Sequence, residues 1–203
     1  MIADKSKFWK EIIKATVKIT IAGFLIGYLH QHDSILAIIL GLKVVHSAYD
    51  LAFKNKQKNW IVPIGMIITG LVGIGSEFIG VTYNHWEYHD IGNHLPHWLL
   101  FAWMLSFSFI YKIERGIFDS LQNKSLKNKL FWAMFIAFLF PVFGEVITIY
   151  LGVWTYHIPY QFLGIPFLVY IGLPFIHLGI NAWLYYINKK HNFKDPVFSE
   201  KAK

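Results

Sequence analysis

The chain has 203 residues, of which 55% are hydrophobic and 15% are charged, and it contains no cysteine. Its mean hydropathy is +0.42, and this composition excludes a disordered protein and an ordinary soluble domain. Because cysteine is absent, a disulfide framework, a zinc ribbon and a thiol nucleophile are excluded as well. The formal net charge of +7 can be interpreted only together with the positions of the basic residues.

Apolar segments of membrane-spanning length recur along the whole chain. The first is long, lacks a small-residue cleavage site and leads directly into the second, so we expect a retained helix rather than a signal peptide. The sequence predicts an all-α, polytopic membrane protein with a single transmembrane domain over residues 1–203. We interpret the apolar segments as six transmembrane helices at about 12–30, 34–53, 60–83, 96–113, 130–152 and 164–187.

The basic residues predict the orientation of these helices. Of the 19 Lys and Arg residues, 18 lie in the N-terminal segment up to Lys18, at 54–58, at 112–129 and in the tail after residue 188. All four segments fall on one side of a six-helix arrangement, while the opposite connections contain no Lys or Arg. The positive-inside rule then places both termini in the cytoplasm, with the chain in the cell membrane. The positive net charge therefore reflects the orientation of the helices and an attraction to anionic lipids, and we expect no nucleic-acid partner.

One sparse pattern, Glu-x8-Trp-x-Tyr-His, occurs twice with an offset of 68 residues. This offset spans two helices, so the segments at 60–113 and 130–187 are predicted to form a parallel duplicated hairpin after an N-terminal hairpin at 12–53. We expect the two copies to build one shared site in the outer half of the bundle. The copies are Glu77, Trp86, Tyr88 and His89, and Glu145, Trp154, Tyr156 and His157.

Glu77 and Glu145 are the candidate catalytic residues, and each stands inside an apolar run. An ionised carboxylate is costly at that depth, so each should face the bundle interior and be paired or protonated. A carboxylic acid that stays neutral can donate a proton. The alternative is structural, since each Glu could bond Tyr88 or Tyr156 of its own loop and fix the hairpin.

Trp86 and Trp154 are open to two interpretations. Tryptophan is common at membrane interfaces, but equivalent placement nine residues after each Glu also suits a pocket whose Trp and Tyr faces stabilise a carbocation. The spacings His85-x3-His89 and His94-x2-His97 would suit metal ligation on one helical face, although Gly and Pro residues interrupt that segment. We therefore predict hydrogen-bonding or proton-handling histidines, no metal and no other cofactor.

Lys43 is the one basic residue outside the four basic segments, near the centre of the second predicted helix. His46 and Asp50 follow at i+3 and i+7 and share its face. A mid-membrane ammonium needs an anion, so we expect Lys43 to pair with Asp50 or with one of the two glutamates. Lys43 could bind substrate beside the repeated residues, or it could join His177 and Asn181 in a polar network that fixes helix packing.

Proline and glycine residues predict irregular points in the helices. Prolines inside apolar runs are expected to kink the helices and open space in the bundle. Glycines ahead of Glu77 are expected to allow close helix approach. The residues concerned are Pro141, Pro166 and Pro174, and Gly70, Gly73 and Gly75.

The segment from Gly144 to Asn181 resembles a known group of proteins. It contains Gly-Glu-x6-Gly-Val-Trp-Thr-Tyr, then Leu-Gly-Ile-Pro-Phe and Gly-Leu-Pro-Phe, and is similar to the membrane carotenoid enzymes, namely the lycopene cyclase domain and the carotenoid hydratases. The resemblance implies duplicated hairpins and a redox-neutral acid–base step on an isoprenoid lipid. The cyclases carry Pro-x-Glu-Glu where this chain has Pro174-Phe175-Ile176-His177, so the resemblance implies that reaction class rather than lycopene cyclisation itself.

Three functional classes follow from the sequence. The first is an enzyme of the cyclase, isomerase or hydratase type that acts on an apolar lipid through the two glutamates. The second is a non-catalytic lipid-binding or assembly protein in which the repeated residues lock two hairpins, and the third is a proton-coupled transporter. Association into a homo-oligomer is compatible with each of them.

Overall fold

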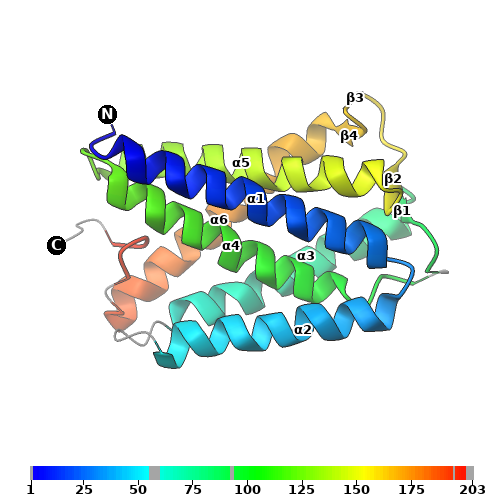
Figure 1. Cartoon of the computed structure of the whole chain (residues 1–203), viewed down its shortest axis with the longest axis horizontal. Coiled ribbons are helices and arrows are strands. Elements are labelled where there is room, and N and C mark those ends of the chain that lie inside the picture. The colour runs from blue at the N-terminus through cyan, green and yellow to red at the C-terminus, as the bar shows by residue number, and fades with distance from the viewer. Residues whose placement is uncertain (1, 55–59, 92–93, 194, 200–203) are drawn as a thin grey trace.

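The computed structural model describes residues 2–54, 60–91, 94–193 and 195–199 and shows an all-helical bundle with four short strands (Figure 1). Each predicted apolar segment corresponds to one helix, although α4 continues well past residue 113 and α6 begins after residue 164. A π-helix, η1 (Asp50–Lys54), extends α2. The α-helices are α1 (Lys5–Leu29), α2 (Asp33–Tyr49), α3 (Ile61–Thr82), α4 (Leu99–Ser120), α5 (Leu126–Tyr150) and α6 (Phe167–His191).

Five of the helices in the described part of the chain are long and apolar enough to cross a membrane: α1, α2 with η1, α3, α5 and α6. α4 has a similar length but carries Lys112, Glu114 and Arg115 in its second half. It is the central helix, because it packs against α1, α2, α3 and α5. Phe107, Tyr111 and other residues of α4 form much of the core. A central helix can carry a buried polar group where a neighbouring helix supplies its partner, as α6 does for Glu114.

Large apolar side chains cover the outside of the bundle. Those of Ile21 on α1, Leu42 on α2 and Phe175 on α6 are 63%, 66% and 71% exposed. Among the described residues, α4 contributes none of these exposed large hydrophobic side chains. Apolar surface of this extent needs a cover other than water.

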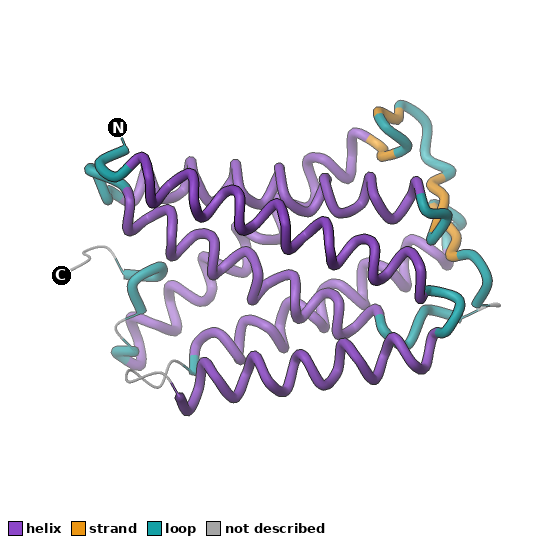
Figure 2. Tube along the Cα trace, viewed as in Figure 1, coloured by secondary structure: helices purple, strands orange, loops and turns teal. Residues whose placement is uncertain are grey.

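The connections between helices gather at two opposite ends of the bundle (Figures 1 and 2). The start of α1, η1, the α4–α5 connection and the end of α6 lie at one end, and the strands lie at the other. Lys5, Lys54 and Lys190 stand at the helix termini of the first end. The predicted segregation of basic residues therefore holds for these helix ends. Other lysines of the basic segments lie outside the described residues, namely Lys56, Lys58, Lys194, Lys201 and Lys203.

The end opposite to these lysines contains two strand pairs that the sequence did not predict. β1 (Trp86–Tyr88) pairs antiparallel with β2 (Trp154–Tyr156). β3 (Gln161–Phe162) pairs with β4 (Ile165–Pro166), which leads into α6. Pro141 and Pro174 lie inside α5 and α6 as expected. The expectation of a kink at Pro166 is wrong, because this residue precedes the first turn of α6, where its missing N–H costs nothing.

Candidate functional site

The helices that carry the two glutamates end in the same way. Asn84 follows α3 with a φ of 55°, and Gly152 follows α5 at the equivalent position with a φ of 74°. A residue in this left-handed region is a common helix terminator, because it turns the chain back over the last carbonyl groups. Three backbone hydrogen bonds also recur with the 68-residue offset. In the first copy, the backbone N–H groups of Tyr83, Asn84 and His85 donate to the carbonyl oxygens of Ile79, Val81 and Gly80, respectively. In the second copy, those of Leu151, Gly152 and Val153 donate to the carbonyl oxygens of Ile147, Ile149 and Thr148, respectively.

These turns bring each tryptophan–tyrosine pair back toward the glutamate of its own copy. The Glu77 carboxylate accepts three hydrogen bonds: from Trp86 Nε1 at 2.8 Å, from the Tyr88 hydroxyl at 2.8 Å and from Trp103 Nε1 at 3.1 Å. An indole N–H can only donate, so this surrounding suits an acceptor-only carboxylate. Trp103 comes from α4 and was not expected from the sequence, because only its place in the bundle connects it to the repeat.

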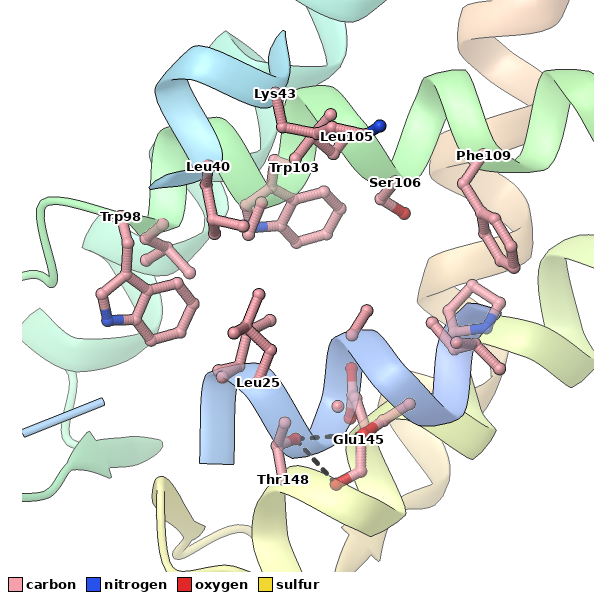
Figure 3. A pocket seen from close by; sticks show the side chains of 18 of the residues that line it. Leu25, Leu40, Lys43, Trp98, Trp103, Leu105, Ser106, Phe109, Glu145 and Thr148 are labelled. Atoms are coloured by element: carbon pink, nitrogen blue, oxygen red, sulfur yellow. Dashed lines mark hydrogen bonds between the residues drawn. The ribbon is translucent and has the colours of Figure 1, made fainter. Parts of the chain in front are cut away.

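Glu145 has fewer partners than Glu77. Tyr156 donates to its Oε2 at 3.0 Å, and no other side chain in the described ranges donates to it. The indole Nε1 of Trp154, the counterpart of Trp86, is buried and has no hydrogen-bond partner among these residues. The Thr148 hydroxyl bonds backbone carbonyls of its own helix instead (Figure 3). The two copies are therefore chemically unequal, and Glu145 retains capacity for a further partner.

The two motif copies meet across the β1–β2 ribbon. Trp86 is opposite Tyr156, and Tyr88 is opposite Trp154. The paired rings meet edge to face, with centroid distances of 5.5 Å and 5.7 Å, a favoured aromatic geometry. Burial and the nearby carboxylates raise the pKa of the Tyr88 and Tyr156 phenols well above their usual range. Both phenols therefore remain hydrogen-bond donors at neutral pH.

A cavity of about 800 Å³ lies beside this aromatic ribbon and is of the size that ligand pockets commonly have. Its wall includes both glutamates, both motif tryptophans and both motif tyrosines, together with Lys43. Apolar side chains of α1, α2 and α4, such as Leu25, Leu40 and Leu105, form much of the remainder (Figure 3). Seven of the nine predicted site residues thus share one cavity, although they come from five elements of the chain, namely α2, α3, β1, α5 and β2.

His89 and His157 are the two predicted site residues that do not line the cavity. Successive side chains of a strand point to opposite faces, so with Tyr88 turned inward, His89 turns away. His89 Nδ1 lies 2.9 Å from the Gly152 carbonyl oxygen, and its Nε2 lies 3.1 Å from Thr155 Oγ1. These contacts, together with the hydrogen bond from the His157 N–H to the His85 carbonyl oxygen at 2.7 Å, tie the two motif copies together, so both histidines support the ribbon rather than line the cavity.

Lys43 does not make the predicted ion pair. Its side chain extends toward the cavity (Figure 3), and within the described ranges no carboxylate lies at ion-pair distance from it. Asp50 instead contacts Lys54 Nζ at 3.1 Å and His46 Nε2 at 3.2 Å. The expectation failed because Asp50, although on the same face, lies seven positions farther along the helix, about 10 Å away along the axis, where Lys54 and His46 contact it.

His177 and Asn181 have a partner that the sequence interpretation missed. Glu114 of α4 is fully buried, and its Oε1 lies 2.8 Å from His177 Nε2 and 3.1 Å from Asn181 Nδ2. Glu114 stands between Lys112 and Arg115 in the basic segment 112–129, so nothing in the sequence indicated its place inside the bundle. A polar network of Glu114, His177 and Asn181 therefore links α4 and α6, in place of the network in which Lys43 was expected to join His177 and Asn181.

A separate group at the strand end of the bundle has the composition of a metal site. Ligand atoms of Asp33, His94 and His97 lie within 4.8 Å of one another. The backbone N–H of His97 also donates to Asp33 Oδ1 at 2.8 Å. The sequence singled out the histidine pair without Asp33, and it predicted no metal. None of the three residues lines the cavity, so this group is not part of the acid–aromatic site.

Gly80 offers a test of how tightly the ribbon is held. A Cβ atom at this position would overlap with the Trp86 ring, whereas a Cβ at Gly75 on the same helix would meet no neighbour within 4 Å. We expect Gly80→Ala to lower the free energy of unfolding in detergent by about 1–3 kcal/mol through overpacking. Gly75→Ala is the matched control and should raise it by about 0.5–1 kcal/mol. Equal effects of the two substitutions would contradict the close Gly80–Trp86 contact.

The arrangement combines an incompletely satisfied carboxyl group, a second carboxylate held by three donors, and aromatic faces in an apolar cavity. Such a set can transfer a proton to an apolar molecule and stabilise the cation that results. In comparisons with known proteins, the chain matches no protein-family model, no curated protein and no solved structure.

Proposed function

We propose that the chain is a multi-pass membrane protein that binds an isoprenoid-type lipid in this cavity and carries out a redox-neutral acid–base step on it, as a cyclase, isomerase or hydratase. The proposal rests on the surroundings of Glu145. This residue lines an apolar, aromatic cavity, and its carboxyl group has a single side-chain donor among the described residues. A carboxyl group in such surroundings is suited to protonating an apolar substrate.

Three features support membrane embedding. Five helices have the length and composition of membrane spans, and large apolar side chains face outward. The basic residues cluster in four segments that alternate with connections lacking Lys and Arg. We propose that all six helices lie in the cell membrane, with α4 shielded by its neighbours and both termini in the cytoplasm.

The orientation can be tested by thiol labelling, because the chain has no cysteine. Gln161, in β3, and Lys124, in the α4–α5 connection, lie at opposite ends of the bundle. A Gln161→Cys variant is expected to react with a membrane-impermeant maleimide in intact cells. A Lys124→Cys variant should react only after lysis. The reverse labelling pattern would contradict the proposed topology.

The two glutamates take different roles in the proposed reaction. Glu145 donates its proton to one carbon of a C=C bond, which forms a C–H bond and leaves a carbocation on the other carbon. Glu77, held by three donors, supplies a fixed negative charge, and the Trp and Tyr faces add stabilisation. Loss of a proton to the Glu145 carboxylate, or capture of water with loss of a proton, completes the step without oxidation or reduction.

The resemblance of the second copy to carotenoid enzymes supports the same reaction class. The motif residues Glu145, Trp154 and Tyr156, on which that resemblance rests, all line the cavity. Pro174 is followed by Phe, Ile and His rather than by a Glu pair. This difference favours a product other than that of the lycopene cyclases.

A non-catalytic lipid-binding or assembly role is the second candidate, and Glu77 favours it. Two of its three donors, Trp86 and Tyr88, come from the loop that follows its own helix. This is the arrangement expected of a residue that fixes a hairpin. Under this alternative, the cavity would hold a lipid without changing it.

Solvent-deuterium incorporation distinguishes the two candidates. The purified protein is incubated in deuterium oxide with linear prenyl lipids, and the extracted lipids are analysed by mass spectrometry. Proton transfer to a C=C bond inserts deuterium from the solvent, so we expect lipids of increased mass. Bound lipid that remains free of deuterium would refute the enzyme and leave the lipid-binding role.

A further inference from the structure

Three lysines from three different helices line the same cavity as the glutamates. They are Lys18 of α1, Lys43 of α2 and Lys112 of α4, and all three are exposed side chains on an otherwise mainly apolar wall. Their helices are neighbours, because α4 packs against both α1 and α2. The cavity therefore has a cationic region in addition to its acidic, aromatic region.

None of the three lysines has an ion-pair partner among the residues that the structure describes. Asp50 attracts Lys112 from a greater distance but already contacts His46 and Lys54. Glu11 likewise attracts Lys18 but lies 3.8 Å from Lys14. Cations at this depth of a bundle require an anion, and the described chain does not provide one at ion-pair distance.

Lys112, unlike the other two lysines, is well separated from the acidic region along the bundle. Trp103, which bonds Glu77, and Lys112 are both on α4 and differ by nine positions. At 1.5 Å per helical residue, this is about 14 Å along the axis. A molecule whose anionic head contacts Lys112 and whose chain reaches the acidic region must therefore have an apolar chain of at least this length.

We propose that the ligand is an amphiphile, a prenyl lipid with a phosphate or diphosphate head that binds Lys18, Lys43 and Lys112 while its unsaturated chain extends to Glu145. Lysine is a common phosphate ligand that acts as a point charge, and three ammonium groups match the charge of a diphosphate. The chain chemistry rests on the proposed function above, but the anionic head is inferred from the lysines alone. A headless polyene would leave these cations without a partner.

Quenching of tryptophan fluorescence measures this binding, because Trp86, Trp98, Trp103 and Trp154 line the cavity. The full chain in a non-ionic detergent is titrated with geranylgeranyl diphosphate, geranylgeraniol, phosphatidylglycerol and inorganic diphosphate. We expect the prenyl diphosphate to bind at least about tenfold more tightly than the alcohol. Inorganic diphosphate, which lacks the chain, should bind more weakly. Tighter binding of phosphatidylglycerol would overturn the prenyl assignment and give the head site to a membrane phospholipid.

Single substitutions assign the head to the three lysines. Lys18→Gln, Lys43→Gln and Lys112→Gln should each weaken prenyl diphosphate binding about tenfold, as expected for loss of a charged hydrogen bond, and leave geranylgeraniol binding unchanged. Lys43→Arg should retain binding. Lys10→Gln is the matched control, because Lys10 is exposed on α1 but does not line the cavity. Equal affinities for the diphosphate and the alcohol, or unchanged binding in all three Gln variants, would overturn the proposal.

The same titration separates this inference from the proposed reaction. Glu145→Gln should keep the preference for the prenyl diphosphate, because it changes the other region of the cavity. Lysine-dependent binding without any deuterium incorporation would leave the head site intact and refute only the enzyme. Deuterium incorporation into the alcohol, with no preference for the diphosphate, would refute only the head site.

Discussion

Replacing Glu145 by Gln is expected to lower the rate of deuterium incorporation by about 10²–10⁴-fold, the usual contribution of a general acid–base group. Glutamine has nearly the same size and can still accept the hydrogen bond that Tyr156 donates at 3.0 Å, but it cannot release a proton at neutral pH. The fold and the affinity for lipid should be unchanged. The rate is measured by mass spectrometry, and the affinity by tryptophan quenching.

Glu77→Gln is expected to reduce the rate as well, but for a different reason. Its carboxylate accepts from Trp86, Tyr88 and Trp103, so a neutral amide removes negative charge near the cation and turns its NH₂ group toward donors. Because the two acids serve one step, the double variant should be little slower than the slower single variant. If the fold reductions in rate of the two single variants multiply in the double variant, the two acids act independently.

Two outcomes would contradict this assignment. Full turnover by Glu145→Gln would remove it from the reaction and favour the role of a hairpin anchor. Loss of turnover on treatment with a chelator, and its recovery with Zn²⁺, would instead implicate the group formed by Asp33, His94 and His97. We expect chelators to leave the rate unchanged, because that group does not line the cavity.

Replacing His177 by Leu is expected to lower the free energy of unfolding by about 3–5 kcal/mol, the cost of leaving a buried charged group without its partner. Glu114 is fully buried, and its Oε1 lies 2.8 Å from His177 Nε2, while its Oε2 has no hydrogen-bond partner in the described part of the chain. Removal of the imidazole leaves Asn181 as the remaining side-chain contact. Unfolding in detergent, followed by circular dichroism, gives the change.

His46→Leu is the matched control, because His46 also contacts a carboxylate but is 56% exposed. Exposed pairs contribute about 0–1 kcal/mol, so this variant should behave nearly as the unsubstituted protein. The double variant Glu114→Leu, His177→Leu should regain most of the lost stability, because it leaves no buried charge. Equal effects of His177→Leu and His46→Leu would show that the Glu114–His177 contact does not stabilise the bundle.

The sequence by itself determined the helices and the spacing within each motif copy. Apolar runs of this length favour helices because each helix satisfies its own backbone groups, and turn residues such as Asn84 and Gly152 end α3 and α5 at the same point. With eight residues between Glu and Trp, a short turn returns the indole to its own helix. Local geometry was therefore sufficient to predict that Glu77 and Tyr88, or Glu145 and Tyr156, would meet.

Only the tertiary structure decided which helices face one another, and it changed the chemistry of both copies. Trp103 reaches Glu77 because Gly73 leaves room for its ring between α3 and α4, and the second copy has no such donor among the described residues. Glu114 meets His177, and Lys112 lines the same cavity as Lys18 and Lys43, across gaps of more than 60 residues in sequence. Such contacts depend on the rotation and depth of each helix, which interlocking side chains set collectively.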